Sequence, residues 1–159
     1  MTDSTLFDLA FLCAAPFWAL LILAPGRRLT DRVAASPLPL LPVIAVYLAL
    51  AVPVFPELWA AVRHPDLAGF QELMTLGGGA GAIWAQVIAW DLFIGQWMYR
   101  EARSLGIHPL VMGPLLVLTI LLSPFGLLLF LPLRAALRHR RRTASPYGVA
   151  APGSGPATP

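Results

Sequence analysis

Asp91 is the residue of this chain whose type and position most suggest chemistry. It lies in the middle of an apolar stretch, residues 80–99, that otherwise has the composition of a membrane-spanning helix. An ionised carboxylate at that depth costs at least ~2.5 kcal/mol, so a partner, water or a function must offset it. We therefore predict a candidate polar site at Asp91, where the carboxylate acts as a proton acceptor or as a polar anchor between helices.

Two amides flank this carboxylate. Gln86 and Gln96 each lie five residues from Asp91, which is roughly 140° around a helix with 3.6 residues per turn. They do not share its helical face, but they lie within about 80° of each other. We include Gln86 and Gln96 in the candidate polar site as groups that assist Asp91.

Other reactive side chains form no recognisable constellation. His64, His108 and His139 are scattered along the sequence without the spacing of metal ligands, so we expect no metal site and no cofactor. Cys13 is the only cysteine, which excludes an intrachain disulfide. The arginine clusters border apolar segments and no soluble recognition module accompanies them, so we expect no nucleic-acid partner.

Composition places the chain in a lipid bilayer. Of its 159 residues, 58% are hydrophobic and 12% are charged, whereas a soluble domain has roughly 25% charged residues. Apolar segments cover residues 5–24, 38–55, 80–99 and 109–133, each near the ~17–25 residues needed for a crossing. We predict an all-α integral membrane bundle of four transmembrane helices over residues 1–142.

The remaining segments are short or polar. Residues 56–76 contain apolar side chains at helical spacing and are expected to form a short surface helix. Residues 143–159 consist mainly of Ala, Pro, Gly, Ser and Thr and are predicted to be a disordered tail. The sequence starts without the basic region of a secretory signal, so segment 5–24 is expected to remain in the mature protein. The absence of Lys and Asn leads us to hypothesise a bacterial plasma-membrane protein.

Arginine supplies all eleven basic side chains, and most of them flank apolar segments. Such clusters usually contact lipid headgroups and control topology. The predicted headgroup contacts are Arg27, Arg28, Arg32, Arg138, Arg140, Arg141 and Arg142.

The fourth apolar segment decides how these arginines are distributed. With four full crossings, five arginines face one side and six the other, which predicts no orientation. If Ser123-Pro124-Phe125-Gly126 instead breaks segment 109–133 into a re-entrant pair, the distribution becomes ten against one. A single helix kinked at Pro124 is favoured, because membrane helices tolerate proline.

Three stretches of the chain resemble the abscisic-acid-deficient-four-like membrane family. They are residues 24–32 (APGRRLTDR), residues 84–97 (WAQVIAWDLFIGQW) and Pro124-Phe-Gly126. The resemblance implies a small multi-helix membrane protein; the plant member is required for making neoxanthin from violaxanthin. The family commonly has a His before the Asp and an Arg after it at positions that are Gln86 and Gln96 here. Glutamine cannot titrate, so acid-assisted epoxide opening by that His is not supported in this chain.

Two classes of function follow. The leading hypothesis is a protein that acts on, or binds, a carotenoid or another isoprenoid in the lipid phase, with Asp91 at its site. The alternative is a non-enzymatic scaffold or accessory subunit in which Asp91 joins its helix to a neighbour, either in a homo-oligomer or with another membrane protein.

Overall fold

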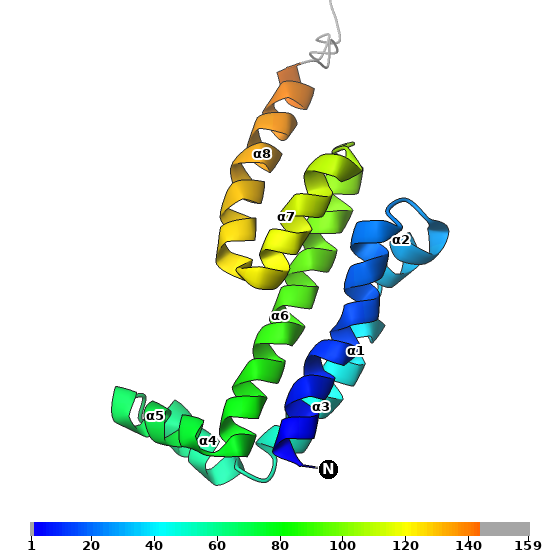
Figure 1. Cartoon of the computed structure of the whole chain (residues 1–159). Helices are drawn as coiled ribbons and strands as arrows, with labels where there is room; N and C mark the ends of the chain where they lie inside the picture. Colours follow the sequence, from blue (N-terminus) through cyan, green and yellow to red (C-terminus); the bar gives the residue numbers. More distant parts are fainter. Residues whose placement is uncertain (1, 144–159) are drawn as a thin grey trace, which may run out of the picture.

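A computed structural model describes residues 2–143, and this part of the chain is entirely helical (Figure 1). The predicted all-α class is therefore confirmed. Apart from Thr143, the predicted disordered tail lies outside the described residues. The elements are α1 (Asp3–Leu23), α2 (Arg28–Ala35), the 3-10 helix η1 (Leu38–Leu40), α3 (Leu41–Ala51), α4 (Phe55–Arg63), α5 (Leu67–Thr75), α6 (Gly77–Ser104), α7 (Pro109–Leu121) and α8 (Ser123–Thr143).

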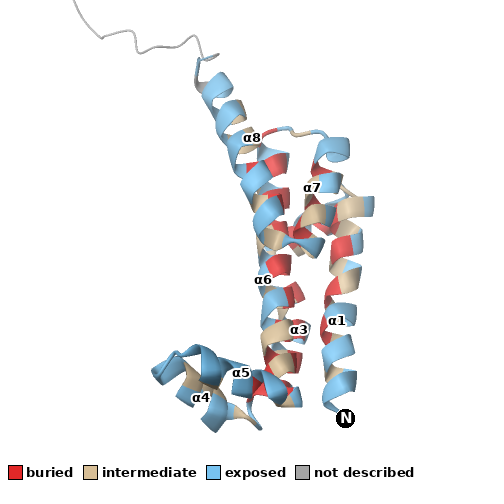
Figure 2. Ribbon diagram, turned by 60° about the vertical axis from the view of Figure 1, so that its left-hand side comes forward, coloured by how far each residue is buried: buried red, intermediate tan, exposed pale blue. Residues whose placement is uncertain are grey.

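Helix α6 is the centre of the fold. It has 28 residues and packs along α1 and α3, while the shorter α7 and α8 lie against its C-terminal half (Figure 1). The buried positions of α1, α6 and α7 form one continuous core that includes Trp18, Leu92, Met98 and Leu116. Figure 2 shows these buried positions on the facing sides of the helices. Every other element is positioned relative to α6.

Glycines allow the neighbouring helices to approach α6 closely. Gly78 and Gly81 lie on the face of α6 that packs against Leu50 of α3, where a Cβ atom would come within about 3 Å of that residue. The glycine-rich run 77–81 forms the first turn of α6, and its small residues serve as the packing surface typical of membrane helix pairs.

The predicted surface segment forms two short helices at the N-terminal end of α6. Helices α4 and α5 lie across that end of the bundle (Figure 1). Asp66 caps α5, because its Oδ1 accepts a hydrogen bond from the Gly69 backbone N–H at 2.8 Å. Leu73 is the buried residue of α5, and it packs on Gly79 at the start of α6.

The fourth apolar segment is a helical hairpin. Helix α7 ends at Leu121, Leu122 adopts a non-helical backbone (φ −149°, ψ 74°), and α8 returns along α7. The favoured prediction of one helix kinked at Pro124 is therefore wrong, and the broken alternative is correct. Pro124 lies in the first turn of α8, where its missing N–H costs nothing. Gly126 allows α8 to approach α7 closely, because a Cβ atom at this position would collide with Thr119.

Four full crossings are not confirmed. Among the described helices, α1 by itself is long and apolar enough to cross a membrane. Two further stretches meet that criterion only when two helices are joined across a bend. These are residues 28–51, bent by 74°, and residues 67–104, bent by 103°.

We expect Gly95→Ala to destabilise the fold, because a Cβ at Gly95 would overlap the indole of the buried Trp18. Overpacking of this kind typically costs about 1–3 kcal/mol. Gly113→Ala in α7 is the matched control: nothing lies within 4 Å of its added Cβ, and alanine is the better helix former. Unfolding in SDS, followed by circular dichroism, should show a loss for the first variant only. Equal stability of the two variants would contradict the close contact of α6 with α1.

Candidate functional site

Asp91 lies at the midpoint of α6 and points into the protein. Asp91 is only 8% exposed, so its side chain does not lie on the outer surface of the helix bundle. Ile88 and Gly95, on the same helical face, are also buried. The Ser123 side chain, at the start of α8, lies near this carboxylate. Among the described side chains, no arginine pairs with this carboxylate.

The hairpin brings the N-terminus of α8 to the depth of Asp91. Helix α7 has 13 residues and so extends about 20 Å, which equals the rise along α6 from Ser104 back to Asp91. The N-terminal end of a helix carries partial positive charge and unpaired N–H groups. Broken membrane helices commonly direct such ends at buried anionic groups. In α8 itself Pro124 has no N–H, and the N–H groups of Phe125 and Gly126 bond to the Leu122 carbonyl. The partial positive charge of this helix end and the Ser123 side chain are therefore what α8 offers to offset the buried carboxylate.

The three members of the predicted polar site point to different neighbours. Gln96 is 4% exposed, and its Nε2 donates a hydrogen bond of 3.4 Å to the Val33 carbonyl of α2. Gln86 is exposed on the side of α6 that faces α3. Asp91 faces the α7–α8 hairpin. Each amide is about 140° around the helix axis from Asp91. The two amides and the carboxylate therefore lie in separate environments.

A groove lies between α3 and α6 on the outside of the bundle. It has a volume of about 400 Å³ and an almost wholly apolar lining. We call it the α3–α6 groove, and its principal lining residues are Leu40, Ile44, Tyr47, Gln86, Trp90 and Phe93. Trp90 and Phe93 are 57% and 50% exposed and lie edge to face, with ring centroids 6.2 Å apart. Gln86 is the one amide among these residues.

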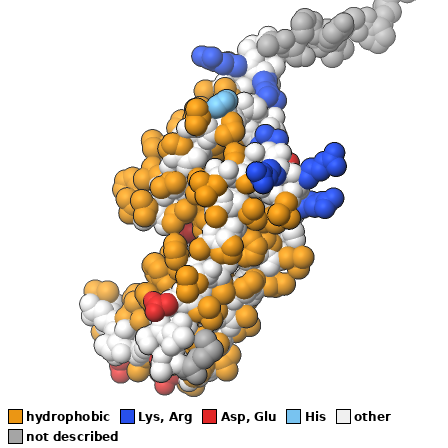
Figure 3. All heavy atoms as spheres, turned by 45° about the vertical axis from the view of Figure 1, so that its right-hand side comes forward, with side chains coloured by type: hydrophobic (Ala, Val, Ile, Leu, Met, Phe, Trp, Pro, Cys, Tyr) orange, Lys and Arg blue, Asp and Glu red, His pale blue; other side chains and the backbone are white. Residues whose placement is uncertain are grey.

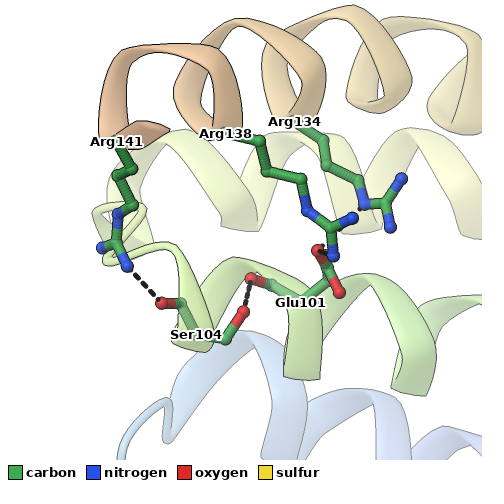
Figure 4. Close-up of polar contacts among 5 residues, drawn as sticks. All are labelled: Glu101, Ser104, Arg134, Arg138 and Arg141. Carbon is green, nitrogen blue, oxygen red and sulfur yellow. Dashed lines mark hydrogen bonds and ion pairs between the residues drawn. The ribbon is translucent and has the colours of Figure 1, made fainter. Parts of the chain in front are cut away.

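A charged cluster fastens α8 to the C-terminal end of α6 (Figure 4). Arg134 Nε donates to Glu101 Oε1 at 2.9 Å, and Arg138 pairs with the same oxygen. Arg134 also lies over the Trp97 ring at 5.3 Å. Burial by itself raises the pKa of Glu101. The hydrogen bonds and charges of Arg134 and Arg138 together lower this pKa by more than burial raises it, so the pKa of Glu101 lies below its ordinary value. Glu101 therefore stays ionised at neutral pH.

A second polar cluster fastens the loop after α1 to α6. The Tyr99 hydroxyl donates to Asp31 Oδ1 at 2.8 Å and accepts from the Gly26 backbone N–H at 2.9 Å. Arg103 lies 3.8 Å from the same Asp31 oxygen. Gly26 has φ +81°, a conformation that favours glycine. The sequence carries no local signal for this contact, because Gly26 and Tyr99 are 73 residues apart.

The predicted headgroup arginines all lie at this end of the molecule. Arg27, Arg28, Arg32 and Arg140 are exposed. Arg138 pairs with Glu101, and Arg141 donates to the Ser104 carbonyl at 2.9 Å (Figure 4). Arg142 lies within α8. Figure 3 shows the basic side chains gathered at one end and most acidic ones at the other, with hydrophobic side chains between them.

Across residues 2–143, no three His, Cys, Asp or Glu side chains gather as a metal site would require. The polar groups that sequence reasoning did not select are Ser123, Glu101, Asp31 and Tyr99. Ser123 is part of the Ser-Pro-Phe-Gly stretch that was considered as a possible break in the fourth apolar segment. Its position near Asp91 could be seen only in the folded structure.

The comparison with known families agrees with this architecture. The model of the ABA4-like family, described as ABA DEFICIENT 4-like, matches residues 5–130, from α1 into α8. The chain therefore belongs to the ABA4-like family, as its sequence resemblance indicated. No curated protein and no solved structure matches it. Family membership and the apolar helices are consistent with a membrane protein.

We expect Ser123→Ala to destabilise the protein through the loss of the Asp91 interaction. Hydrogen bonds between membrane helices average ~0.6 kcal/mol and reach about 1.7 kcal/mol. In an Asp91→Leu background the same substitution should cost nothing further, because its partner is gone. Ser104→Ala is the control: it is at an exposed position of α6, and its hydroxyl bonds only to the Glu101 carbonyl of the same helix. SDS unfolding of the four combinations at Asp91 and Ser123 gives their coupling energy, and a value of zero would show that they do not interact.

Proposed function

We propose that the chain crosses the membrane three times, through α1, η1 with α3, and α6. The fourth apolar segment enters as the re-entrant hairpin α7–α8 instead of forming a fourth crossing. Support comes from the length of α1, from the position of α6 beside both α1 and α3, and from the break at Leu122. The hairpin is acceptable at membrane depth because the backbone groups of Leu122 are paired: its N–H donates to the Leu118 carbonyl, and its own carbonyl accepts from the backbone N–H groups of Phe125 and Gly126.

The hairpin also determines how the arginines are divided between the two ends of the molecule. With α8 returning to the C-terminal end of α6, ten arginines lie at that end, and Arg63 on α4 lies at the other. We propose that the arginine-rich end faces the cytoplasm, because basic residues close to membrane helices are retained there. A bacterial plasma membrane remains our hypothesis for the compartment.

For function, we propose that the protein binds a carotenoid or another isoprenoid lipid in the α3–α6 groove. The groove itself carries this proposal. It is open on the membrane-facing surface, apolar, and walled by the exposed rings of Trp90 and Phe93. Flat apolar walls of this kind suit an elongated, branched or polyene chain, and the Gln86 amide provides one polar contact.

The position of Asp91 favours binding over catalysis. Asp91 is absent from the groove lining and instead contacts the hairpin, so a ligand in the groove would not reach its carboxylate. In this proposal Asp91 is a polar anchor for α7–α8. The same observation also supports the second candidate function, an accessory subunit of a membrane complex, in which Asp91 has only this structural role.

The topology is tested by reporters. A fluorescent protein fused at the C-terminus should fold and fluoresce, because it stays in the cytoplasm. Alkaline phosphatase inserted after His64, between α4 and α5, should be active because it is exported. An active phosphatase at the C-terminus with an inactive one after His64 would reverse the proposed orientation. Activity at both positions would instead indicate a fourth crossing.

The binding proposal predicts that the wild-type chain, purified from carotenoid-producing cells, retains pigment and that Trp90→Ala retains several-fold less. Trp59→Ala is the matched control, because Trp59 is a similarly exposed indole on α4, outside the groove. Absorption spectra of the purified proteins, normalised to folded yield, measure the difference. Asp91→Asn should keep the pigment profile. If wild type neither retains nor alters any pigment or other isoprenoid, the binding proposal is wrong and the accessory-subunit candidate is favoured.

A further inference from the structure

A second, smaller pocket adjoins the α3–α6 groove. It has a volume of about 170 Å³ and lies between the C-terminal end of α2 and α6. Ser36, Gln96, Trp97 and Arg100 are among its lining residues, and we call it the Arg100 pocket. Phe93 lines both this pocket and the groove, so the two are neighbouring compartments on one surface.

The polar groups of the Arg100 pocket are all capable of donating hydrogen bonds. Within residues 2–143 Arg100 forms no ion pair, unlike Arg103 and Arg134. Gln96 uses one amide N–H for the Val33 carbonyl, which leaves the second N–H available. The Ser36 oxygen accepts from the Leu38 backbone N–H at 3.2 Å, so its own hydrogen is free to be donated.

These donors line a pocket that contains no negatively charged side chain. No Asp or Glu lines the pocket, and Arg32 lines an adjoining hollow together with Ser36. A guanidinium with nearby neutral donors is the arrangement that suits a phosphate group, which arginine can bind through two parallel hydrogen bonds.

The two compartments lie at the depths that an amphipathic lipid requires. Gln86 and Arg100 are about 21 Å apart along α6, against a hydrocarbon core of about 30 Å. Arg100 directly follows the apolar stretch that ends at Tyr99, so it lies where headgroups begin. A ligand with its tail in the groove would therefore have its head beside Arg100.

We propose that the ligand is a phosphorylated isoprenoid, with its tail in the α3–α6 groove and its phosphate in the Arg100 pocket. The inference rests on the proposed function and specifies the ligand class. A groove of about 400 Å³ with aromatic walls suits one branched chain, whereas a bilayer phospholipid carries two. Arg100 is the determinant of headgroup preference, and Trp90 with Phe93 holds the tail.

Binding to the full-length chain in neutral detergent tests this assignment. The probes are geranylgeranyl phosphate, geranylgeraniol, inorganic phosphate and phosphatidylglycerol, and native mass spectrometry measures the bound fractions. We expect the phosphate ester to bind about tenfold more tightly than the alcohol, as one hydrogen-bonded charge interaction allows. Arg100→Gln should abolish that preference and leave alcohol binding unchanged, while Arg100→Lys should keep part of it. Arg63→Gln, at the opposite end, should behave as wild type.

The outcomes separate this inference from the proposal beneath it. If the alcohol binds but the phosphate adds no affinity, or Arg100→Gln keeps the preference, the headgroup assignment fails and the groove proposal stands. Inorganic phosphate binding as tightly as the ester would indicate a free-anion site. Displacement of the ester by equimolar phosphatidylglycerol would indicate a general lipid site. Each of these two results also overturns the assignment. If neither isoprenoid binds, the groove proposal fails as well.

Discussion

The fold depends on burying one carboxylate in the middle of an apolar helix. Asp91 cannot face acyl chains without a large cost, and the chain provides it with protein contacts by folding the fourth apolar segment back on itself. The α7–α8 hairpin places Ser123 and the N-terminus of a helix beside the carboxylate. The broken helix and the buried acid thus explain each other, since each would be unfavourable alone.

The end of the molecule opposite α4 and α5 is held by a different kind of interaction. There, Glu101 and Asp31 neutralise Arg134, Arg138 and Arg103, and they join α8 and α2 to the end of α6. In the proposed topology these pairs lie close to the headgroup level, gather the basic residues on one side of the membrane and leave other arginines available to lipids. The hairpin makes this possible, since a fourth crossing would have carried the tail arginines to the far side.

The sequence was sufficient for features that depend on composition and spacing. Composition predicted the all-α class, and the helical surface segment followed from the spacing of Leu67, Leu73 and their neighbours. The four full crossings are not confirmed, and helix α2 was not predicted. The break after Leu121 could not be decided, because proline is accepted both within a membrane helix and in the first turn of a new one. Ser123 became significant only through its contact with Asp91. The grouping of Gln86 with Gln96 was limited in the same way, since helical angle does not indicate which neighbouring element each amide meets.

The separation of Asp91 from the groove changes how the family relationship should be understood. Gln86 faces the groove, Gln96 faces α2, and Asp91 faces the hairpin. A titratable side chain at position 86 would lie beside a groove ligand, whereas Asp91 would still be on another side of the helix. In the proposed function the carboxylate anchors the hairpin, and the residues at positions 86 and 96 line the two compartments that would hold the ligand. In this chain both are neutral amides, which suits a site that holds its ligand without transferring a proton.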